Sequence, residues 1–308
     1  MNKLIVSSSP HIKTNNDTQR VMLDVIIALI PALIAGTIIY GIRALLVVLS
    51  CVIASVASEY IFNLVVKKEQ TVFDLSAIIT GLILGLSLHA NAPIWQCVIG
   101  SVFAIIVIKC LFGGLGANFA NPAATARVFL LVCFSNTLAG GANPVDLKAG
   151  ATPLVQLANG GKLPSLVDML LGQRGGSIGE ACIIALVIGF AYLVVRKVIH
   201  FEVPLVMIAT VFVLYLIVEG DFNVALYQVL AGGLVFGAVF MATDYVTTPI
   251  TRAGKMIFAF GCGLLTFLIR MYGNYPEGVS FAILFMNILS PYIESWTKTK
   301  ALGKRGNK

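Results

Sequence analysis

The feature that most constrains this chain is a succession of apolar runs, each about as long as a bilayer-spanning helix. An α-helix needs roughly 20 apolar residues to cross the hydrocarbon core. Of the 308 residues, 58% are hydrophobic and only 11% are charged, whereas about a quarter of an ordinary soluble chain is charged. A water-soluble domain of this length could not bury so much apolar surface. The sequence therefore predicts an all-α, polytopic protein that lies in a lipid bilayer.

The apolar runs predict about ten transmembrane helices in two halves. Residues 1–20 are polar and have no apolar core, so no signal peptide is expected. The predicted parts are a cytoplasmic segment 1–20, a first five-helix half 21–137, an external loop 138–177, a second five-helix half 178–296 and a basic tail 297–308. The predicted helices cover about 21–40, 43–66, 73–89, 93–112, 121–137, 178–196, 203–219, 223–243, 254–270 and 278–296.

The basic residues predict which end of each helix faces the cytoplasm. Lys and Arg accumulate in cytoplasmic loops. With the N-terminus inside, fifteen of the 21 basic residues fall inside, five fall outside, and Arg127 falls within a helix. Both termini are therefore predicted to be cytoplasmic and the long loop external. The net charge of +7 comes from residues at the ends of apolar runs, so binding to nucleic acid is not expected.

Two short glycine motifs suggest that the halves are related. Residues 81–85 and 233–237 both read G-L-x-x-G, each in the third predicted helix of its half. Two halves of five helices enter the membrane in opposite senses, which predicts an inverted repeat. The spacing is also common in any pair of packed membrane helices, where small residues allow close approach.

Charged residues at membrane depth are candidates for function, because each is costly in hydrocarbon. Glu59 lies well inside the second predicted helix, and Asp244 follows the eighth in a run that also holds Thr243 and Thr247. Such a run could hold the edge of a flavin or a cation. Glu59 and Asp244 are our candidates for an ion path, whereas Asp74 is a plausible helix cap.

The six cysteines and three histidines are scattered. They predict no metal site, and no nucleophile with its base is visible, so no catalytic residue is assigned.

The predicted external loop contains a small-residue stretch, Asp146-Leu147-Lys148-Ala149-Gly150-Ala151-Thr152. Gly150 and Ala151 make the backbone beside Thr152 accessible, as a modifying enzyme would require. On its own, the sequence Gly-Ala-Thr is a weak signal.

Read as a whole, the chain resembles the RnfD/NqrB family of membrane flavoprotein subunits. The resemblance is closer to the RnfD branch, since the long N-terminal extension expected of NqrB is missing. The matching stretches run in order along the chain: SPHIKTNNDTQRVMLDVIIALIPA from Ser9, FDLSAIITGLILGL from Phe73, GGLGANFANPAATARVFLL from Gly113, AGATPL from Ala149, FMATDYVTTPIT from Phe240, and YGNYPEGVSFAILFMNILSP from Tyr272.

The resemblance implies FMN joined through its phosphate to Thr152. The family's acceptor pattern is D-x-x-S/T-G-A-T/S, which Asp146, Gly150, Ala151 and Thr152 match, whereas Ala149 replaces the usual hydroxyl residue. The flavin is expected in a crevice between the halves, and a further flavin, riboflavin, is associated with some members of this family. The expected flavin neighbours are Gly150, Ala151, Asn121, Arg127, Thr243, Asp244 and Thr247.

The resemblance further implies a complex in the cytoplasmic membrane of a bacterium or archaeon that couples ferredoxin and NAD to pumping of Na⁺ or H⁺. Expected partners are flavin-bearing and iron–sulfur subunits, membrane-embedded and peripheral, and a flavin transferase for maturation. The alternatives are an NqrB-like subunit of a Na⁺-pumping NADH:quinone oxidoreductase, a solute channel or secondary transporter with the same inverted repeat, and a scaffold that carries no electrons.

Overall fold

In the residues that it describes, the computed structural model is helical, apart from two strands of two residues each. It describes residues 17–138, 141–142, 149–150, 153–158, 164–172, 174–273 and 277–298. The prediction of an all-α polytopic membrane protein is confirmed. The large hydrophobic side chains exposed on α1, α2 and α10 are those that would face lipid.

The first half begins with two long antiparallel helices, followed by shorter ones. Between α2 and α3 the chain passes through a 3₁₀ turn, and α4 continues as a π-helix. The elements are α1 (Thr18–Tyr40), α2 (Ile42–Val66), η1 (Val72–Asp74), α3 (Ser76–Ser87), α4 (Ile94–Val102), η2 (Phe103–Cys110), α5 (Pro122–Cys133) and α6 (Ser135–Leu138).

The described residues between the halves form short elements. Strands β1 (Gly141–Ala142) and β2 (Ala149–Gly150) pair antiparallel, with Gly141 opposite Gly150. Helices α7 (Pro153–Ala158) and α8 (Leu166–Leu171) follow, and Ser165 and Asp168 form a capping box at the start of α8. The predicted boundaries of this loop stay predictions.

The second half also contains a broken third helix. Its elements are α9 (Ile183–Val195), α10 (Glu202–Glu219), α11 (Phe222–Leu230), α12 (Leu234–Phe236), the π-helical η3 (Gly237–Met241), α13 (Arg252–Tyr272) and α14 (Val279–Thr297). Between Leu230 and Leu234 the axis bends by 60°. Gly232 has φ +67°, a backbone conformation that glycine adopts without steric cost.

Helices lie in all ten predicted ranges, and the prediction that each of them spans the bilayer stays a prediction. In the described part of the chain, four helices are long and apolar enough to cross a membrane: α1, α2, α10 and α13. A fifth span results if α11 and the segment Leu234–Met241 are counted together. Helix α3 has 12 residues, about 18 Å, because Leu75 takes a left-handed conformation just before it. The ten-helix inverted repeat stays a prediction.

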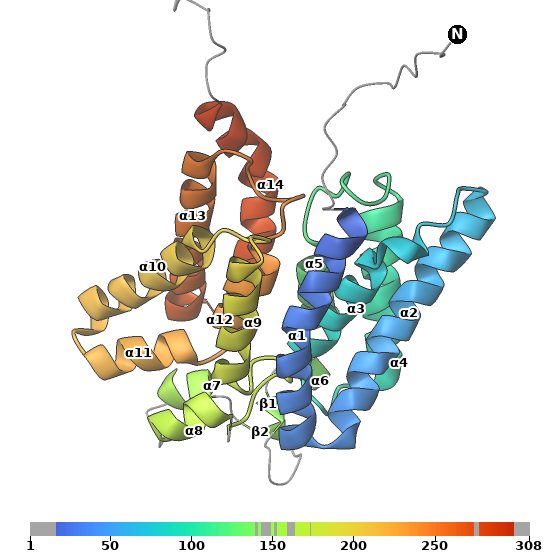
Figure 1. Cartoon of the computed structure of the whole chain (residues 1–308). Coiled ribbons are helices and arrows are strands. Elements are labelled where there is room, and N and C mark those ends of the chain that lie inside the picture. The colour runs from blue at the N-terminus through green and yellow to red at the C-terminus, as the bar shows by residue number, and fades with distance from the viewer. Residues whose placement is uncertain are drawn as a thin grey trace, which may run out of the picture.

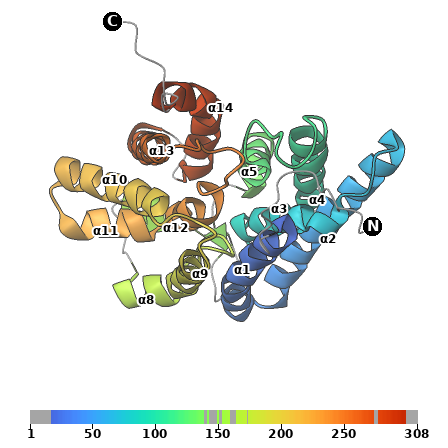
Figure 2. The same ribbon diagram turned by 45° about the horizontal axis from the view of Figure 1, so that its top comes forward.

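The two halves meet along two pairs of helices. Helix α1 packs against α9, and α5 packs against α14, as Figure 2 shows. The start of α1 and the end of α14 lie at one end of the molecule, and α7, α8 and both strands lie at the opposite end (Figure 1). We call these the terminal end and the loop end.

The G-L-x-x-G motif of α3 allows this helix to pack closely against α2, as the small-residue spacing in the sequence suggested. A Cβ atom added at Gly81 would lie 2.6 Å from Cα of Val52, and one added at Gly85 would lie 2.8 Å from Cα of Val48. These distances are too short for carbon atoms not bonded to each other, so α3 and α2 can approach this closely only with glycine at both positions. The short helix α3 is thereby fixed within the first half.

Candidate functional site

A cavity lies between the two halves, at the terminal end. Its volume is about 780 Å³ when the open space at its mouth is included. The wall is mostly apolar and includes side chains of α1, α3, α9 and η3. Its polar members are Ser76, Thr80, Lys109, Asn118, Asn121, Thr243 and Asp244.

Asn121 joins the two halves at this cavity. It caps α5, with its Oδ1 accepting from the backbone N–H groups of Ala123 at 3.0 Å and Ala124 at 3.1 Å. Its Nδ2 donates to the carbonyl of Met241, at the end of η3, over 3.3 Å. Pro122 suits the first position of the helix, where no N–H partner is needed. The side chain therefore determines how η3 sits against α5.

Asn118 offers the cavity an unsatisfied acceptor. Its Oδ1 is buried and has no hydrogen-bond partner among the described residues. A buried acceptor without a donor is costly, so a ligand with an N–H or O–H group would be stabilised here. This atom is the clearest polar recognition point on the cavity wall.

Asp244 and its threonines form a turn beside the cavity. One carboxylate oxygen of Asp244 accepts from the N–H of Val246 at 3.1 Å, and the other accepts from the hydroxyl of Thr247 at 3.2 Å. Thr248 donates its hydroxyl to the carbonyl of Asp244 at 2.8 Å, and Thr243 donates to Val239. The oxygen-bearing side chains noted in this part of the sequence therefore make hydrogen bonds within the turn and to the helix before it. An ion-path role for Asp244 stays a prediction.

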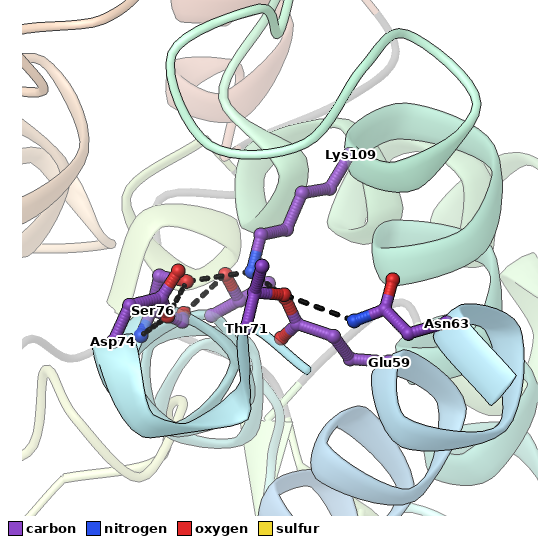
Figure 3. Close-up of polar contacts among 7 residues, drawn as sticks. Glu59, Asn63, Thr71, Asp74, Ser76 and Lys109 are labelled. Carbon is purple, nitrogen blue, oxygen red and sulfur yellow. Dashed lines mark hydrogen bonds and ion pairs between the residues drawn. The ribbon is translucent and has the colours of Figure 1, made fainter. Parts of the chain in front are cut away.

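A buried charged cluster stands beside the cavity (Figure 3). Nζ of Lys109 donates to Oε1 of Glu59 over 2.8 Å and to Oγ of Ser76 over 2.6 Å. Ser76 in turn donates its hydroxyl to Asp74, whose carboxylate also accepts the backbone N–H of Ser76 at 2.8 Å. The N-cap residue of α3 is Leu75, so Asp74, the cap suggested from the sequence, lies one residue before it and accepts from the first residue of the helix.

Glu59 has further partners on its own side of the cluster. Thr71 donates its hydroxyl to Oε1 of Glu59 over 2.7 Å, and Asn63 donates to the Thr71 hydroxyl over 3.0 Å. The other oxygen of Glu59, Oε2, is buried and has no partner among the described residues. The cluster holds two carboxylates and one ammonium, so a negative charge is in excess when all three are ionised.

Sequence reasoning overlooked Lys109, which it counted as a cytoplasmic residue at the end of a helix. Its side chain is only 2% exposed, and it also lines the cavity. The available signal was its position inside the apolar run FAIIVIKCLF. The residue lies in the π-helix η2, a form that often occurs at functional sites.

The structure places Arg127 away from this cavity. Its guanidinium is 2% exposed and donates from Nη2 to Oε2 of Glu277 over 2.9 Å. It lines a second cavity, of about 330 Å³, together with Glu180. The predicted flavin neighbours are thus divided: Asn121, Thr243 and Asp244 lie around the first cavity, the buried Thr247 lies in the adjoining turn, and Arg127 lies at the second.

The predicted acceptor Thr152 lies outside the described residues, as do Asp146 and Ala151. The residues flanking it are at the loop end (Figure 1). Gly150 pairs with Gly141 in the strand pair. Leu154 is 4% exposed and packs in a small apolar cluster with Met169 and Ala231. Both flanks of Thr152 are therefore held at the end of the molecule opposite the first cavity.

Two arginines stabilise the helix break to which Leu154 is anchored. Arg174 donates to the carbonyl of Leu230 over 2.6 Å. Arg270 donates to the carbonyls of Gln228 and Ala231 over 2.5 Å and 3.2 Å. These carbonyls end α11 and have no intrahelical donor, and cations are favourable at a helix C-terminus. The bend is thus stabilised without an α-helical continuation.

Comparison of the sequence with known proteins gives the family. The sequence pattern of the NQR2, RnfD, RnfE family matches residues 5–303. The chain belongs to this family. The match covers nearly the whole chain, from the segment before α1 to the tail after α14, and confirms the resemblance inferred from the motifs.

Several relatives are similar over almost their full length, and each is the component designated D of its complex. The one from the Na(+)-translocating ferredoxin:NAD(+) oxidoreductase complex of Acetobacterium woodii is 45% identical over 97% of this chain and 95% of the relative. The one from the proton-translocating ferredoxin:NAD(+) oxidoreductase complex of Clostridium ljungdahlii is 40% identical over 99% and 97%. The one from the ion-translocating oxidoreductase complex of Stutzerimonas stutzeri is 36% identical over 94% and 93%. The shared designation supports the RnfD branch.

Proposed function

We propose that the chain is the membrane-embedded RnfD component of an ion-translocating ferredoxin:NAD⁺ oxidoreductase complex and that it carries electrons through flavin. Its relatives are components of complexes with that activity, and its helices form a multi-pass membrane protein with a mostly apolar cavity between the halves. The partners are the other subunits of the complex, among them flavin-bearing and iron–sulfur subunits.

The observation that carries the electron-transfer role is the 780 Å³ cavity with its partnerless amide oxygen at Asn118. The isoalloxazine ring of a flavin has a planar apolar body and one edge with an N–H donor between two carbonyls. The apolar wall suits the ring body, the Asn118 oxygen suits the N–H, and the Lys109 ammonium suits a carbonyl oxygen. When bound, such a ring would accept and release electrons.

A covalent FMN at Thr152 would occupy a different site. The flanks of Thr152 lie in β2 and α7, at the loop end (Figure 1), whereas the cavity is lined by the start of α1 and the start of α3, at the terminal end. We therefore assign the cavity to a non-covalent flavin of the riboflavin type and the loop end to FMN joined to Thr152 by a phosphodiester. This modifies the expectation of one flavin resting between the halves.

The proposed orientation follows from the ends of the helices. The end of α2, the end of α9 and the start of α13 lie at the terminal end (Figure 1). Lys67 and Lys68 follow α2, Arg196 follows α9, and Arg252 begins α13. Basic residues mark the cytoplasmic side, so the terminal end faces the cytoplasm and the loop end faces outward. A flavin transferase acting outside the membrane would then attach FMN to Thr152.

The test is peptide mass and in-gel flavin fluorescence on the complex purified from its own host, or from a host that supplies the flavin transferase. We expect FMN on the peptide containing Thr152, fluorescence that is lost in Thr152→Ala, and fluorescence that is retained in the matched control Thr152→Ser. An unmodified Thr152 in protein from the native host would overturn the covalent assignment.

A further inference from the structure

Lys109 connects the wall of the first cavity to a network of hydrogen bonds. Its side chain lines the cavity and is only 2% exposed. A lysine ammonium has three N–H donors. Within the described part of the chain two of them are used, one by Glu59 over 2.8 Å and one by Ser76 over 2.6 Å (Figure 3). The third N–H can therefore be donated to a ligand in the cavity.

The other hydroxyl and acid groups on the wall use their hydrogen-bonding capacity within the protein. Each hydroxyl donates to a protein atom: Ser76 to Asp74, Thr80 to the carbonyl of Ser76, Thr243 to the carbonyl of Val239 and Tyr245 to the sulfur of Met22. Both oxygens of the Asp244 carboxylate accept hydrogen bonds, as an ionised carboxylate does. Among the described residues of this wall, Lys109 is therefore the acid that keeps an uncommitted proton.

Two branches of hydrogen bonds continue from the ammonium to the terminal end. In one branch, Ser76 donates its hydroxyl to Asp74, which is half-buried. In the other, the exposed Thr71 donates its hydroxyl over 2.7 Å to the Glu59 oxygen that also accepts from the ammonium. Both branches end in the stretch between α2 and α3, where residues 67–71 are all exposed. The network therefore extends from the cavity to the surface of the terminal end.

The charges on the wall disfavour a ligand that gains negative charge. Among the described residues, the charged side chains that line the cavity are Lys109 and Asp244. Lys109 is already paired with Glu59, so the carboxylate of Asp244 adds a negative charge to this mostly apolar surface. Electrons added to a ligand here would create a second buried charge, which is costly. A proton that arrives with the electrons removes that cost.

We propose that Lys109 is the proton donor of this cavity and that Ser76 and Asp74 replenish its proton from the terminal end. In the transfer, one Nζ–H bond of Lys109 breaks and the proton bonds to a nitrogen or oxygen of the ligand, whose electrons come from the complex. The Lys109 amine then takes the hydroxyl proton of Ser76. Ser76 takes a proton from the Asp74 carboxyl, which regains one from water. Glu59 holds Nζ at the cavity wall throughout. The proposal rests on the flavin assigned to this cavity.

The experiment measures proton uptake by the purified complex while reduced ferredoxin, which brings electrons without protons, reduces it. Stopped-flow absorbance follows the flavin, and a pH-indicator dye in weakly buffered solution follows the proton. In the unmodified complex we expect a phase of proton uptake that coincides with flavin reduction. Lys109→Arg should slow this phase by roughly 100-fold or more, because a guanidinium keeps the charge beside Glu59 but does not release its proton. Ser76→Ala should also slow it, whereas Ser76→Thr, which keeps the hydroxyl, should restore it.

Matched controls separate proton transfer from general damage. Lys68→Arg makes the same change at an exposed lysine after α2. Ser58→Ala removes a buried hydroxyl that donates within its own helix, to the carbonyl of Ala54 over 2.6 Å. Both are expected to take up protons as the unmodified complex does. If Lys109→Arg does not assemble, the comparison of Ser76→Ala with Ser76→Thr still tests the relay, because neither variant changes a charge.

The non-covalent flavin released on denaturation is counted first in each protein, so that the outcomes can be told apart. With flavin in place, proton uptake at the unmodified rate in Lys109→Arg and in Ser76→Ala would overturn the relay. Slow uptake in Asp244→Asn but not in Lys109→Arg would also overturn it, because the carboxyl group would then be the donor. If the unmodified complex releases no such flavin, the flavin assignment of the cavity is wrong and the relay falls with it.

Discussion

The ammonium of Lys109 lies 2.8 Å from Oε1 of Glu59, and both side chains are 2% exposed. The pair links η2 to α2, and through Ser76 it links both to the start of α3. Two groups that looked unrelated in the sequence, a lysine at the end of one apolar run and a glutamate inside another, therefore define one buried ion pair. Glu59 is consequently a less accessible candidate for an ion path than an isolated carboxylate would be.

Lys109→Met is expected to destabilise the protein strongly. Removing one partner of a buried pair leaves the other charge uncompensated and typically costs about 3–5 kcal/mol. The double variant Lys109→Met with Glu59→Gln should recover much of the loss, because no buried charge remains. The apparent midpoint of thermal unfolding in detergent measures both. Arg252→Met, which breaks an exposed pair, should cost less than about 1 kcal/mol. If the loss of stability in the double variant equals the sum of the losses in Lys109→Met and Glu59→Gln, the two side chains are not energetically coupled.

The helices could be predicted from the sequence, but their breaks could not. The length of the apolar runs located each helix, whereas the start of α3 at Ser76 depends on a left-handed Leu75, which no pattern indicates. The break after α11 had a signal in Ala231-Gly232-Gly233, but glycine is also common in continuous membrane helices. Breaks are decided by tertiary partners, here Arg174 and Arg270, which come from distant parts of the chain.

Some of the residues that line the first cavity were named from the sequence, whereas others were not. Asn121 and Asp244 were both named as flavin neighbours from different halves, and the structure places both on one cavity. Arg127 was grouped with them as a charged residue within a predicted helix, yet it lies about one and a half helical turns deeper than Asn121. Glu180 was overlooked because it sits among small residues at a predicted helix start, where a solvated carboxylate is the ordinary interpretation.

Arg270→Met is expected to loosen the break between α11 and α12. It removes the donors of two carbonyls, Gln228 and Ala231, and each unsatisfied buried acceptor costs about 1–3 kcal/mol. Hydrogen exchange measured by mass spectrometry should show faster exchange in peptides covering 228–236. The exposed Arg43 provides the matched control, Arg43→Met, which should leave those peptides unchanged. Equal exchange in both variants would show that the arginine does not stabilise the bend.

Asn121→Asp is expected to separate the capping role of this residue from its role at the cavity. The carboxylate still accepts from Ala123 and Ala124, so α5 keeps its cap, but the donor to the Met241 carbonyl is lost and a charge enters the cavity wall. Non-covalent flavin released from the denatured complex should fall, while the covalent flavin stays. Asn121→Ala should also lose the cap, at a cost of about 0.5–2 kcal/mol. Asn223→Asp, an exposed change, is the control, and undiminished flavin in Asn121→Asp would argue against a flavin in this cavity.

Ala149→Ser would restore the hydroxyl that the family's acceptor pattern has at this position. Ala149 lies in β2 opposite Ala142, next to the glycine that leads to Thr152, so a serine can be introduced without breaking the strand pair. If a hydroxyl here assists recognition by the flavin transferase, the fraction of Thr152 peptides that carry FMN should rise when the transferase is limiting. With excess transferase both proteins should be fully modified. The fraction is measured by peptide mass at matched expression, with Ala142→Ser as the control on the paired strand. A lower fraction in Ala149→Ser would mean that alanine suits this acceptor better than the family pattern indicates.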